Sequence, residues 1–200
     1  MSTDQDRHQR RSIRLKDYDY TSPGAYFVTL VTWRRENLFG KVVDGAMQLN
    51  TWGFLAENEW RRLGQRFESL IVDEFVVMPN HIHGILMVLE NDRSESDAVG
   101  ARQKDSSPSG KTSLASPLQN AIQNNAKGVS RGSIGAMIGA YKSTTARLIN
   151  GLRRTSGARV WQRNYYEHII RNEVEMARIQ TYILANPAGW ESDDENPLSK

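Results

Sequence analysis

The chain has 200 residues, a length that fits one ordinary domain with a long insertion and is too short for two full domains. Hydrophobic residues make up 38% of it and charged residues 24%, which excludes a wholly disordered protein. It contains no cysteine, so disulfides, thiolate metal sites and a cysteine nucleophile are excluded as well. No run reaches the ~18 apolar residues of a membrane span and no apolar signal stretch opens the chain, so we expect a cytoplasmic protein with no membrane partner.

The formal net charge of +3 averages over segments of opposite sign. Residues 131–171 hold eight basic side chains against one acidic side chain, whereas residues 191–200 hold four acidic side chains against one lysine. A basic stretch beside aromatic residues suits a partner with a phosphate backbone, because neutralised phosphates release counterions. A solvated helix face gives the same pattern, so charge alone leaves both interpretations open.

The first 24 residues are polar, and we expect them to form a basic, flexible arm before the folded domain. Residues 25–33 are β-branched and aromatic without a breaker, which predicts a strand buried on at least one face. A weaker hairpin is expected over residues 41–49, with its turn at an Asp-Gly pair.

A helix is predicted next, capped by Asn50 or Thr51 and ending near Gly64. Two apolar runs follow, over residues 70–78 and 82–89, separated only by a Pro-Asn pair. This arrangement predicts two adjacent antiparallel strands joined by a tight connection.

The second half of the chain starts with residues 91–132, a polar stretch without aromatic residues that we expect to be a flexible insertion. Helical spacing of apolar residues then predicts a helix over 133–151, and residues 158–171 favour one or two short strands. A last helix is expected over 173–185, followed by the acidic tail at 191–200. These elements predict an α+β domain over most of the chain, with helices on one face of a mostly antiparallel sheet.

The strongest local signal is His81-Ile82-His83 at the start of the second apolar run. Alternate residues of a strand share a face, so the two imidazoles should lie roughly 6.5–7 Å apart along the backbone while Ile82 points to the other face. Neutral imidazole is a common metal ligand, and two of them can converge on one ion. The pattern predicts a metal site, with two hydrogen-bonded surface histidines as the alternative.

A second signal lies in the last helix, where Tyr182 and Asn186 are four residues apart and therefore share a face. The amide oxygen of Asn186 is a hard metal ligand, and the Tyr182 hydroxyl could lie near the same ion. The alternative for Tyr182 is a half-buried aromatic residue whose hydroxyl contacts water.

Taken together, His81-Ile82-His83 and the Tyr-Ile-Leu-Ala-Asn-Pro segment at 182–187 resemble the single-tyrosine transposases of the HUH endonuclease superfamily, named for histidine, a bulky hydrophobic residue and histidine. More narrowly, the chain is similar to the REP-associated tyrosine transposases. Residues 11–29, 77–83 and 161–171 resemble that family's lead-in and first strand, its metal-ligand strand and the segment before its tyrosine helix. The resemblance implies a ferredoxin-like (RRM-like) sheet of the HUH single-strand nuclease type.

The resemblance also implies an activity: cleavage and rejoining of single-stranded DNA next to hairpin, REP-like sequences through a 5′-phosphotyrosine. It makes Tyr182 the nucleophile and His81, His83 and Asn186 the ligands of a divalent ion, Mg²⁺ or Mn²⁺. Asn186 is one methylene shorter than the glutamine found in many relatives. A tyrosine hydroxyl with a pKa near ~10 needs the charge of such an ion to react at neutral pH.

Two adjacent tyrosines, Tyr165 and Tyr166, are alternative nucleophiles. The sequence places only His168 near them as a candidate ligand, so Tyr182 is preferred and His168 is interpreted as a structural or DNA-contacting residue. The predicted phosphate contacts are Arg11, Arg14, Lys142, Arg147, Arg153, Arg154 and Arg163.

The expected partner is single-stranded DNA with hairpins in the bacterial cytoplasm, at the nucleoid. Relatives act as homodimers or as monomers, and the sequence leaves both states open. Two other functions are kept as alternatives. One is a DNA-binding module of the same fold with little or no catalytic activity. The other is an unrelated metal-dependent hydrolase or RNA-binding sheet, in which the histidines activate water or Tyr26 and Trp33 stack on bases.

Overall fold

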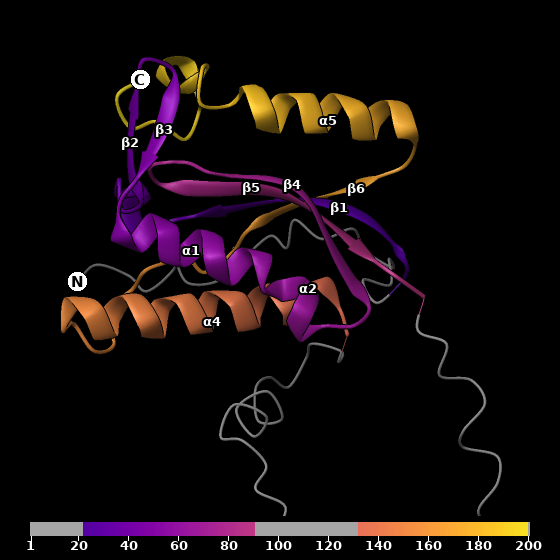
Figure 1. Ribbon diagram of the computed structural model, residues 1–200, viewed down its shortest axis with the longest axis horizontal. Coiled ribbons are helices and arrows are strands. Elements are labelled where there is room, and N and C mark those ends of the chain that lie inside the picture. The colour runs from indigo at the N-terminus through magenta and orange to yellow at the C-terminus, as the bar shows by residue number, and fades with distance from the viewer. Residues whose placement is uncertain (1–21, 91–131, 200) are drawn as a thin grey trace, which may run out of the picture.

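The computed structural model describes residues 22–90 and 132–199, which form a four-stranded sheet with helices on both of its faces (Figure 1). The main elements, in chain order, are β1 Gly24–Val31, α1 Thr51–Arg61, β4 Leu70–Val77, β5 His81–Val88, α4 Ile134–Arg153, β6 Tyr166–Ile170 and α5 Glu173–Ala185. A hairpin of β2 Gly40–Val43 and β3 Ala46–Leu49 lies between β1 and α1. The short helices are η1 Trp33–Arg35, α2 Leu63–Arg66 and η2 Trp190–Ser192.

The sheet has the strand order β4-β5-β1-β6, and every neighbouring pair is antiparallel. β1 is therefore a central strand, paired with β5 on one side and with β6 on the other. Its register sets Val28 opposite Gly84 and Thr29 opposite His83. This order, with a helix after the first strand and another after the third strand of the sheet, is that of a ferredoxin-like domain. The predicted α+β fold with an antiparallel sheet is confirmed.

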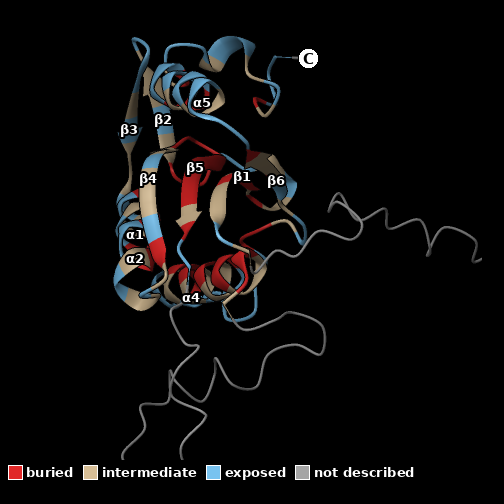
Figure 2. Ribbon diagram, turned by 90° about the vertical axis from the view of Figure 1, so that its right-hand side faces the viewer, coloured by how far each residue is buried: buried red, intermediate tan, exposed pale blue. Residues whose placement is uncertain are grey.

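Helices α1, α2 and α4 lie on one face of the sheet, and α5 lies on the opposite face (Figures 1 and 2). The sequence predicted the first of these layers and did not predict the second. The reason is visible in β5, which is buried on both faces: Ile82 and Leu86 belong to the main core, whereas Ile85 packs with Ile179 and Ile183 of α5. A strand that is apolar on both faces needs cover on each.

The main core lies between the sheet and the α1–α4 layer. Tyr26, Val28 and Leu30 of β1 project into it and are fully buried. Trp60 of α1 lies against Gly84 of β5, where an added Cβ atom would come within 2.6 Å of Cζ2 of the indole. Glycine at position 84 therefore allows the Trp60 ring to lie directly on the sheet behind the histidine strand.

Local sequence signals explain most element boundaries. The Asn50 side chain accepts hydrogen bonds from two backbone N–H groups in the first turn of α1, and the Ser133 hydroxyl accepts one in the first turn of α4. The hairpin and the bounds of α5 are as predicted, while α4 runs slightly beyond its predicted end. Residues 158–171 contribute one strand, β6, and an isolated bridge between Trp161 and Thr32.

The predicted arm and the predicted insertion over 91–132 lie almost wholly outside the described residues. The acidic segment that follows η2 packs against the domain beyond the C-terminal end of α5 (Figure 1). Within the described ranges, no helix combines the length and the apolar character needed to cross a membrane.

Candidate active site

The alternation of β5 places His81 and His83 on the sheet face that carries α5. Both side chains are buried, with exposed fractions of 0% and 4%, and their ring centroids are 4.4 Å apart. Ile82 points to the opposite face and belongs to the main core. The prediction that the two imidazoles share one face of a strand is therefore confirmed.

A hydrogen bond from His81 to the side chain of the neighbouring Asn80 fixes the tautomer of His81. The Asn80 amide nitrogen donates to the carbonyl oxygens of Arg35 and Glu195, at 3.2 and 2.7 Å, so its oxygen is left to accept. This oxygen lies 2.9 Å from Nδ1 of His81, which therefore carries the proton. Nε2 of His81 is buried, has no hydrogen bond of good geometry, and presents a lone pair toward the site.

His83 lies between a threonine and the predicted nucleophile. Its Nδ1 is 2.9 Å from the hydroxyl oxygen of Thr29, the residue opposite it on β1. Its Nε2 is 3.2 Å from the hydroxyl oxygen of Tyr182 on α5. The Phe27 ring stacks on the imidazole with centroids 5.3 Å apart. The structure thus brings Tyr182 to the histidine pair, a meeting that the sequence predicted only through the family resemblance.

Burial keeps both imidazoles neutral at pH 7. It lowers the pKa of His81 to about 4, an effect that the negative charge of Asp193 partly offsets. Burial lowers the pKa of His83 well below its usual value, and the neighbouring His81 lowers it further. Neutral imidazole is the form that binds a metal ion, so this environment prepares both side chains as ligands without competition from protons.

Asn186, at the C-terminal cap of α5, lies one helical turn after Tyr182 and is buried. Its amide nitrogen donates a hydrogen bond of 2.9 Å to Oδ2 of Asp193. Its Oδ1 is buried and, like Nε2 of His81, lacks a hydrogen bond of good geometry. The amide is therefore oriented by a carboxylate so that its oxygen, the atom predicted as a ligand, is left without a donor.

Asp193 is a site residue that the sequence did not identify. One ligand atom each from His81, His83 and Asp193 fall within 4.8 Å of one another. Its segment is held in place by Arg35, whose guanidinium donates to the Asp194 carbonyl oxygen at 2.7 Å and pairs with the Glu195 carboxylate at 3.2 Å. The available signal was a run of acidic residues a few positions after Asn186, which the sequence predicts only as an acidic tail over 191–200.

The residues present fit a divalent metal ion. Two buried acceptor atoms without donors, Nε2 of His81 and Oδ1 of Asn186, lie in the same site as His83 and the Asp193 carboxylate. A buried acceptor without a donor is costly, and an ion would offset that cost. Two imidazole nitrogens with an amide and a carboxylate oxygen form a mixed donor set, which suits Mn²⁺ and accommodates Mg²⁺.

The Tyr182 hydroxyl is protonated in the site as described. Burial raises its pKa above the usual value, and the charges of Asp193, Asp194 and Glu195 raise it further. The side chain is nevertheless 47% exposed and lines a cavity together with His83 and Asn186. The hydroxyl is therefore accessible to a ligand from solvent, and it needs a nearby positive charge to become a nucleophile.

Comparison with known proteins gives the chain a family and a fold. No model of a known protein family matches the chain. An uncharacterised protein of Haemophilus influenzae is 40% identical over 188 residues, which cover 93% of this chain and 92% of that protein. The chain belongs to the same family as this Haemophilus protein.

Transposases are among the solved structures that are similar to the chain. A REP-associated tyrosine transposase bound to a REP hairpin matches with a TM-score of 0.54 and 18% identity, covering 90% of this chain and 74% of that one. The chain has the tyrosine-transposase fold. A candidate transposase from Deinococcus radiodurans matches with a TM-score of 0.37 and 16% identity, covering 86% of this chain and 95% of that one.

Within this tyrosine-transposase fold, the predicted DNA contacts are not gathered at the site. Arg11 and Arg14 lie outside the described residues. Arg147 and Arg153 lie on α4, on the face of the sheet opposite to α5 (Figure 1). Lys142 of α4 is partly buried, and its ammonium donates to the carbonyl oxygens of residues 162–164 at 2.6–3.2 Å. Burial lowers the pKa of Lys142 to about 8.

The alternative nucleophiles occupy other environments. Tyr165 packs against the main core, and the ammonium of Lys142 lies 6.0 Å from its ring centroid. Tyr166 of β6 is 50% exposed, and its ring makes an edge contact with Phe27 at 6.2 Å. Nε2 of His168 is 2.7 Å from the Glu175 carboxylate, which links β6 to the first turn of α5. This contact supports a structural role for His168.

Proposed function

We propose that the protein is a metal-dependent single-stranded DNA strand transferase, a tyrosine transposase that cleaves and rejoins DNA next to hairpin sequences through a 5′-phosphotyrosine. The observation that supports this proposal most directly is the distance of 3.2 Å between the Tyr182 hydroxyl and Nε2 of His83. In the same site, His81 and Asn186 each have a buried acceptor atom without a hydrogen bond. A phenol beside a ready-made set of metal ligands is the arrangement that phosphoryl transfer to tyrosine needs.

His81, His83 and Asn186 would hold the ion, and Asp193 adds a carboxylate to the same site. When bound there, a divalent ion supplies positive charge that polarises the scissile phosphate and favours the phenolate of Tyr182. Mn²⁺ or Mg²⁺ would serve, since both accept oxygen donors and leave positions open for phosphate oxygens.

The strand-cleavage step involves one bond formed and one bond broken. The Tyr182 oxygen attacks the phosphorus in line, its proton is released, and a bond between phosphorus and the phenol oxygen forms. The bond from phosphorus to the 3′-oxygen of the preceding nucleotide breaks, and that oxygen leaves as a 3′-hydroxyl after taking up a proton. No water is consumed, so another 3′-hydroxyl can attack the phosphotyrosine and restore a continuous strand.

Two observations support DNA as the substrate. The structural neighbour of similar fold is bound to a REP hairpin, and this chain carries a basic stretch over 131–171. We propose that Arg11 and Arg14, together with Arg147 and Arg153 of α4, contact phosphates away from the cleavage site. Such contacts position a nucleic acid without reading its sequence.

The test is formation of a covalent adduct. The full chain is incubated with Mn²⁺ or Mg²⁺ and labelled hairpin strands taken from the DNA that flanks its own gene, and products are separated on a denaturing gel. We expect a metal-dependent adduct that is lost in Tyr182→Phe and in His81→Ala. Tyr165→Phe is the matched control, since it also removes one phenol hydroxyl. An adduct that persists in Tyr182→Phe would move the nucleophile to Tyr165 or Tyr166.

A second candidate function is a DNA-binding module of the same fold with little turnover. The specific observation that favours it is the cluster of Asp193, Asp194 and Glu195 around the nucleophile, which raises the pKa of Tyr182. This alternative predicts salt-sensitive binding of the hairpin strands without cleavage or adduct in either metal ion.

A further inference from the structure

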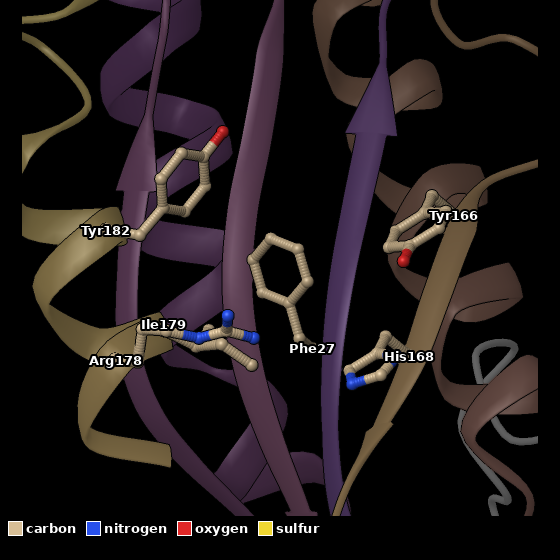
Figure 3. A pocket seen from close by; sticks show the side chains of 6 residues that line it. All are labelled: Phe27, Tyr166, His168, Arg178, Ile179 and Tyr182. Carbon is tan, nitrogen blue, oxygen red and sulfur yellow. The ribbon is translucent and has the colours of Figure 1, made fainter. Parts of the chain in front are cut away.

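A cavity of about 400 Å³ lies beside the proposed active site, between α5 and the β1–β6 edge of the sheet. Figure 3 shows that its walls come from β1, β6 and α5. The lining residues are Phe27, Tyr166, His168, Arg178, Ile179 and Tyr182. The volume lies within the range of small-ligand sites, roughly 300–1,000 Å³. The proposed reaction, as derived above, assigns no role to this cavity.

The position of α5 creates this space. The helix packs mainly on β4, with weaker contact to β5, so β1 and β6 are less covered on the same face. Phe27 and Tyr166 are the aromatic residues that these two strands present there, and the exposed fraction of Tyr166 is 50%. An aromatic surface that a soluble protein leaves uncovered is typical of a binding site.

The aromatic rings of the cavity can contact a flat ligand at one of its faces and at its edge. The Phe27 ring lies edge-on to Tyr166 and to Tyr182, each with centroids 6.2 Å apart and with interplanar angles of 68° and 79°. Figure 3 shows Phe27 between the other two rings. Nucleobases stack on aromatic side chains of this kind whatever their sequence, because every base has a flat aromatic face.

Charge at the cavity favours a phosphate. Arg178 of α5 lines it, and the carboxylate of Glu175, one turn earlier on the helix, lies close enough to interact with its charge. His168 is held at the rim by its contact with Glu175. A guanidinium that lines a cavity can recognise a phosphate group through two parallel hydrogen bonds.

The cavity adjoins the proposed active site. Tyr182 and Phe27 line both this cavity and the one that contains His83 and Asn186. A ligand in the cavity therefore lies next to the atom that would attack phosphorus. We propose that the cavity binds one unpaired nucleobase of the DNA strand, adjacent to the scissile phosphate, stacked on the exposed Tyr166 ring with Phe27 against its edge and its phosphate on Arg178. This inference rests on the proposed function and names the part of the DNA substrate that the cavity binds.

The test uses binding, so that it does not depend on cleavage. The fluorescent base 2-aminopurine is placed at one position at a time in the unpaired segment of the hairpin strand, and the full-length Tyr182→Phe protein is added. Stacking quenches this base, so we expect quenching at one position rather than along the whole segment. Tyr166→Ala should abolish the quenching there and weaken binding about tenfold, whereas Tyr166→Phe should keep it.

Arg178→Gln should weaken binding of the same strand and reduce its salt dependence, because one phosphate contact is lost. Arg61→Gln is the matched control, since Arg61 is an exposed arginine of α1 on the other face of the sheet and pairs with Glu57. Quenching that is uniform along the strand, or that survives Tyr166→Ala, would overturn the inference. So would a free deoxynucleotide monophosphate that competes as well as the strand does.

The two proposals fail in different ways. Position-specific quenching that Tyr166→Ala removes, without any adduct from the wild-type protein, would support the nucleobase cavity and contradict the strand-transfer activity. In a second case, abasic sites are placed at each position next to the scissile phosphate in turn, and the wild-type protein still forms the adduct with every strand. This result would support the strand-transfer activity and contradict the nucleobase cavity.

Discussion

The hydroxyl of Tyr182 lies 3.2 Å from Nε2 of His83, although 99 positions separate the two residues along the chain. The contact exists because α5 packs on the sheet face that the histidine strand leaves free of the main core. Both groups are uncharged at neutral pH: the His83 imidazole is neutral and the Tyr182 phenol is protonated. Under the proposed function, a cation must therefore bind before the Tyr182 phenol can react as a nucleophile.

Asp193 is expected to contribute to metal binding directly or by orienting Asn186. Asp193→Asn removes a carboxylate whose Oδ2 accepts the Asn186 amide hydrogen bond, so the affinity for Mn²⁺ should fall by about 10- to 100-fold. Isothermal titration with Mn²⁺ measures this change without any need for activity. Asp194→Asn is the matched control, because it removes the same charge from the next residue, and it should change the affinity much less. Equal losses in the two variants would contradict a specific role for Asp193.

The metal-free protein should lose stability in mild acid because of the buried imidazoles. The pKa of His81 is about 4 in the folded state and 6.5 when unfolded, so the unfolded chain binds more protons between these values. Stability is then fully present above pH 6.5 and falls as the pH decreases toward 4, by on the order of 3 kcal/mol for this group. His83 acts in the same direction.

Urea unfolding at a series of pH values, in the presence of a chelator, measures this loss. His81→Gln should flatten the pH dependence over the same interval, since glutamine does not titrate. Added Mn²⁺ should raise the stability of the wild-type protein and not that of the variant. A variant with the same acid sensitivity as the wild type would show that other groups cause it.

Gly84→Ala should destabilise the sheet beneath the histidines. A Cβ atom at this position would lie 2.6 Å from the Trp60 indole and 3.0 Å from Cβ of Phe75, so the strand or the indole must shift. Overpacking of this kind costs about 1–3 kcal/mol. Gly139→Ala, in the middle of α4 with nothing within 4 Å of the added atom, should instead leave stability unchanged or raise it slightly. Thermal unfolding of the two variants side by side is the measurement.

Much of the site could be predicted from the sequence because its parts are local. His81 and His83 share a face through the two-residue period of a strand, and Tyr182 and Asn186 share one through the helical turn. The meeting of these two pairs was predicted only through the family resemblance. The location of α5 on the second face depends on the packing of Ile85 with Ile183, which no local pattern specifies.

The residue assignments that the structure corrects are those of charged side chains. Asp193 was assigned only to an acidic tail, because its contact with Asn186 depends on how the chain folds back after α5. Lys142 was assigned to phosphate contact, yet all three of its observed hydrogen bonds go to backbone carbonyl oxygens. A charged side chain looks the same in a sequence whether it faces water, an ion or the backbone.

The acidity of Tyr182 should respond to single charges of the C-terminal segment. Burial and the carboxylates of Asp193, Asp194 and Glu195 raise its pKa, and among these acids Asp194 has no side-chain contact in the described structure. Asp194→Asn should therefore lower the pKa of Tyr182 toward its usual value without disturbing the Asn186 contact. Phenolate absorbance of the metal-free protein, taken as the difference from Tyr182→Phe, follows this titration.

The matched control for this titration is Glu191→Gln, which removes a carboxylate of η2 that is not among the groups acting on Tyr182. It should leave the titration unchanged, whereas Asp194→Asn should shift it to lower pH. If both variants shift the titration equally, the effect is one of net charge, and the C-terminal segment does not tune the nucleophile locally. A shift confined to Asp194→Asn would mean that the proton on Tyr182 is held in part by the segment that also supplies Asp193 to the proposed metal site.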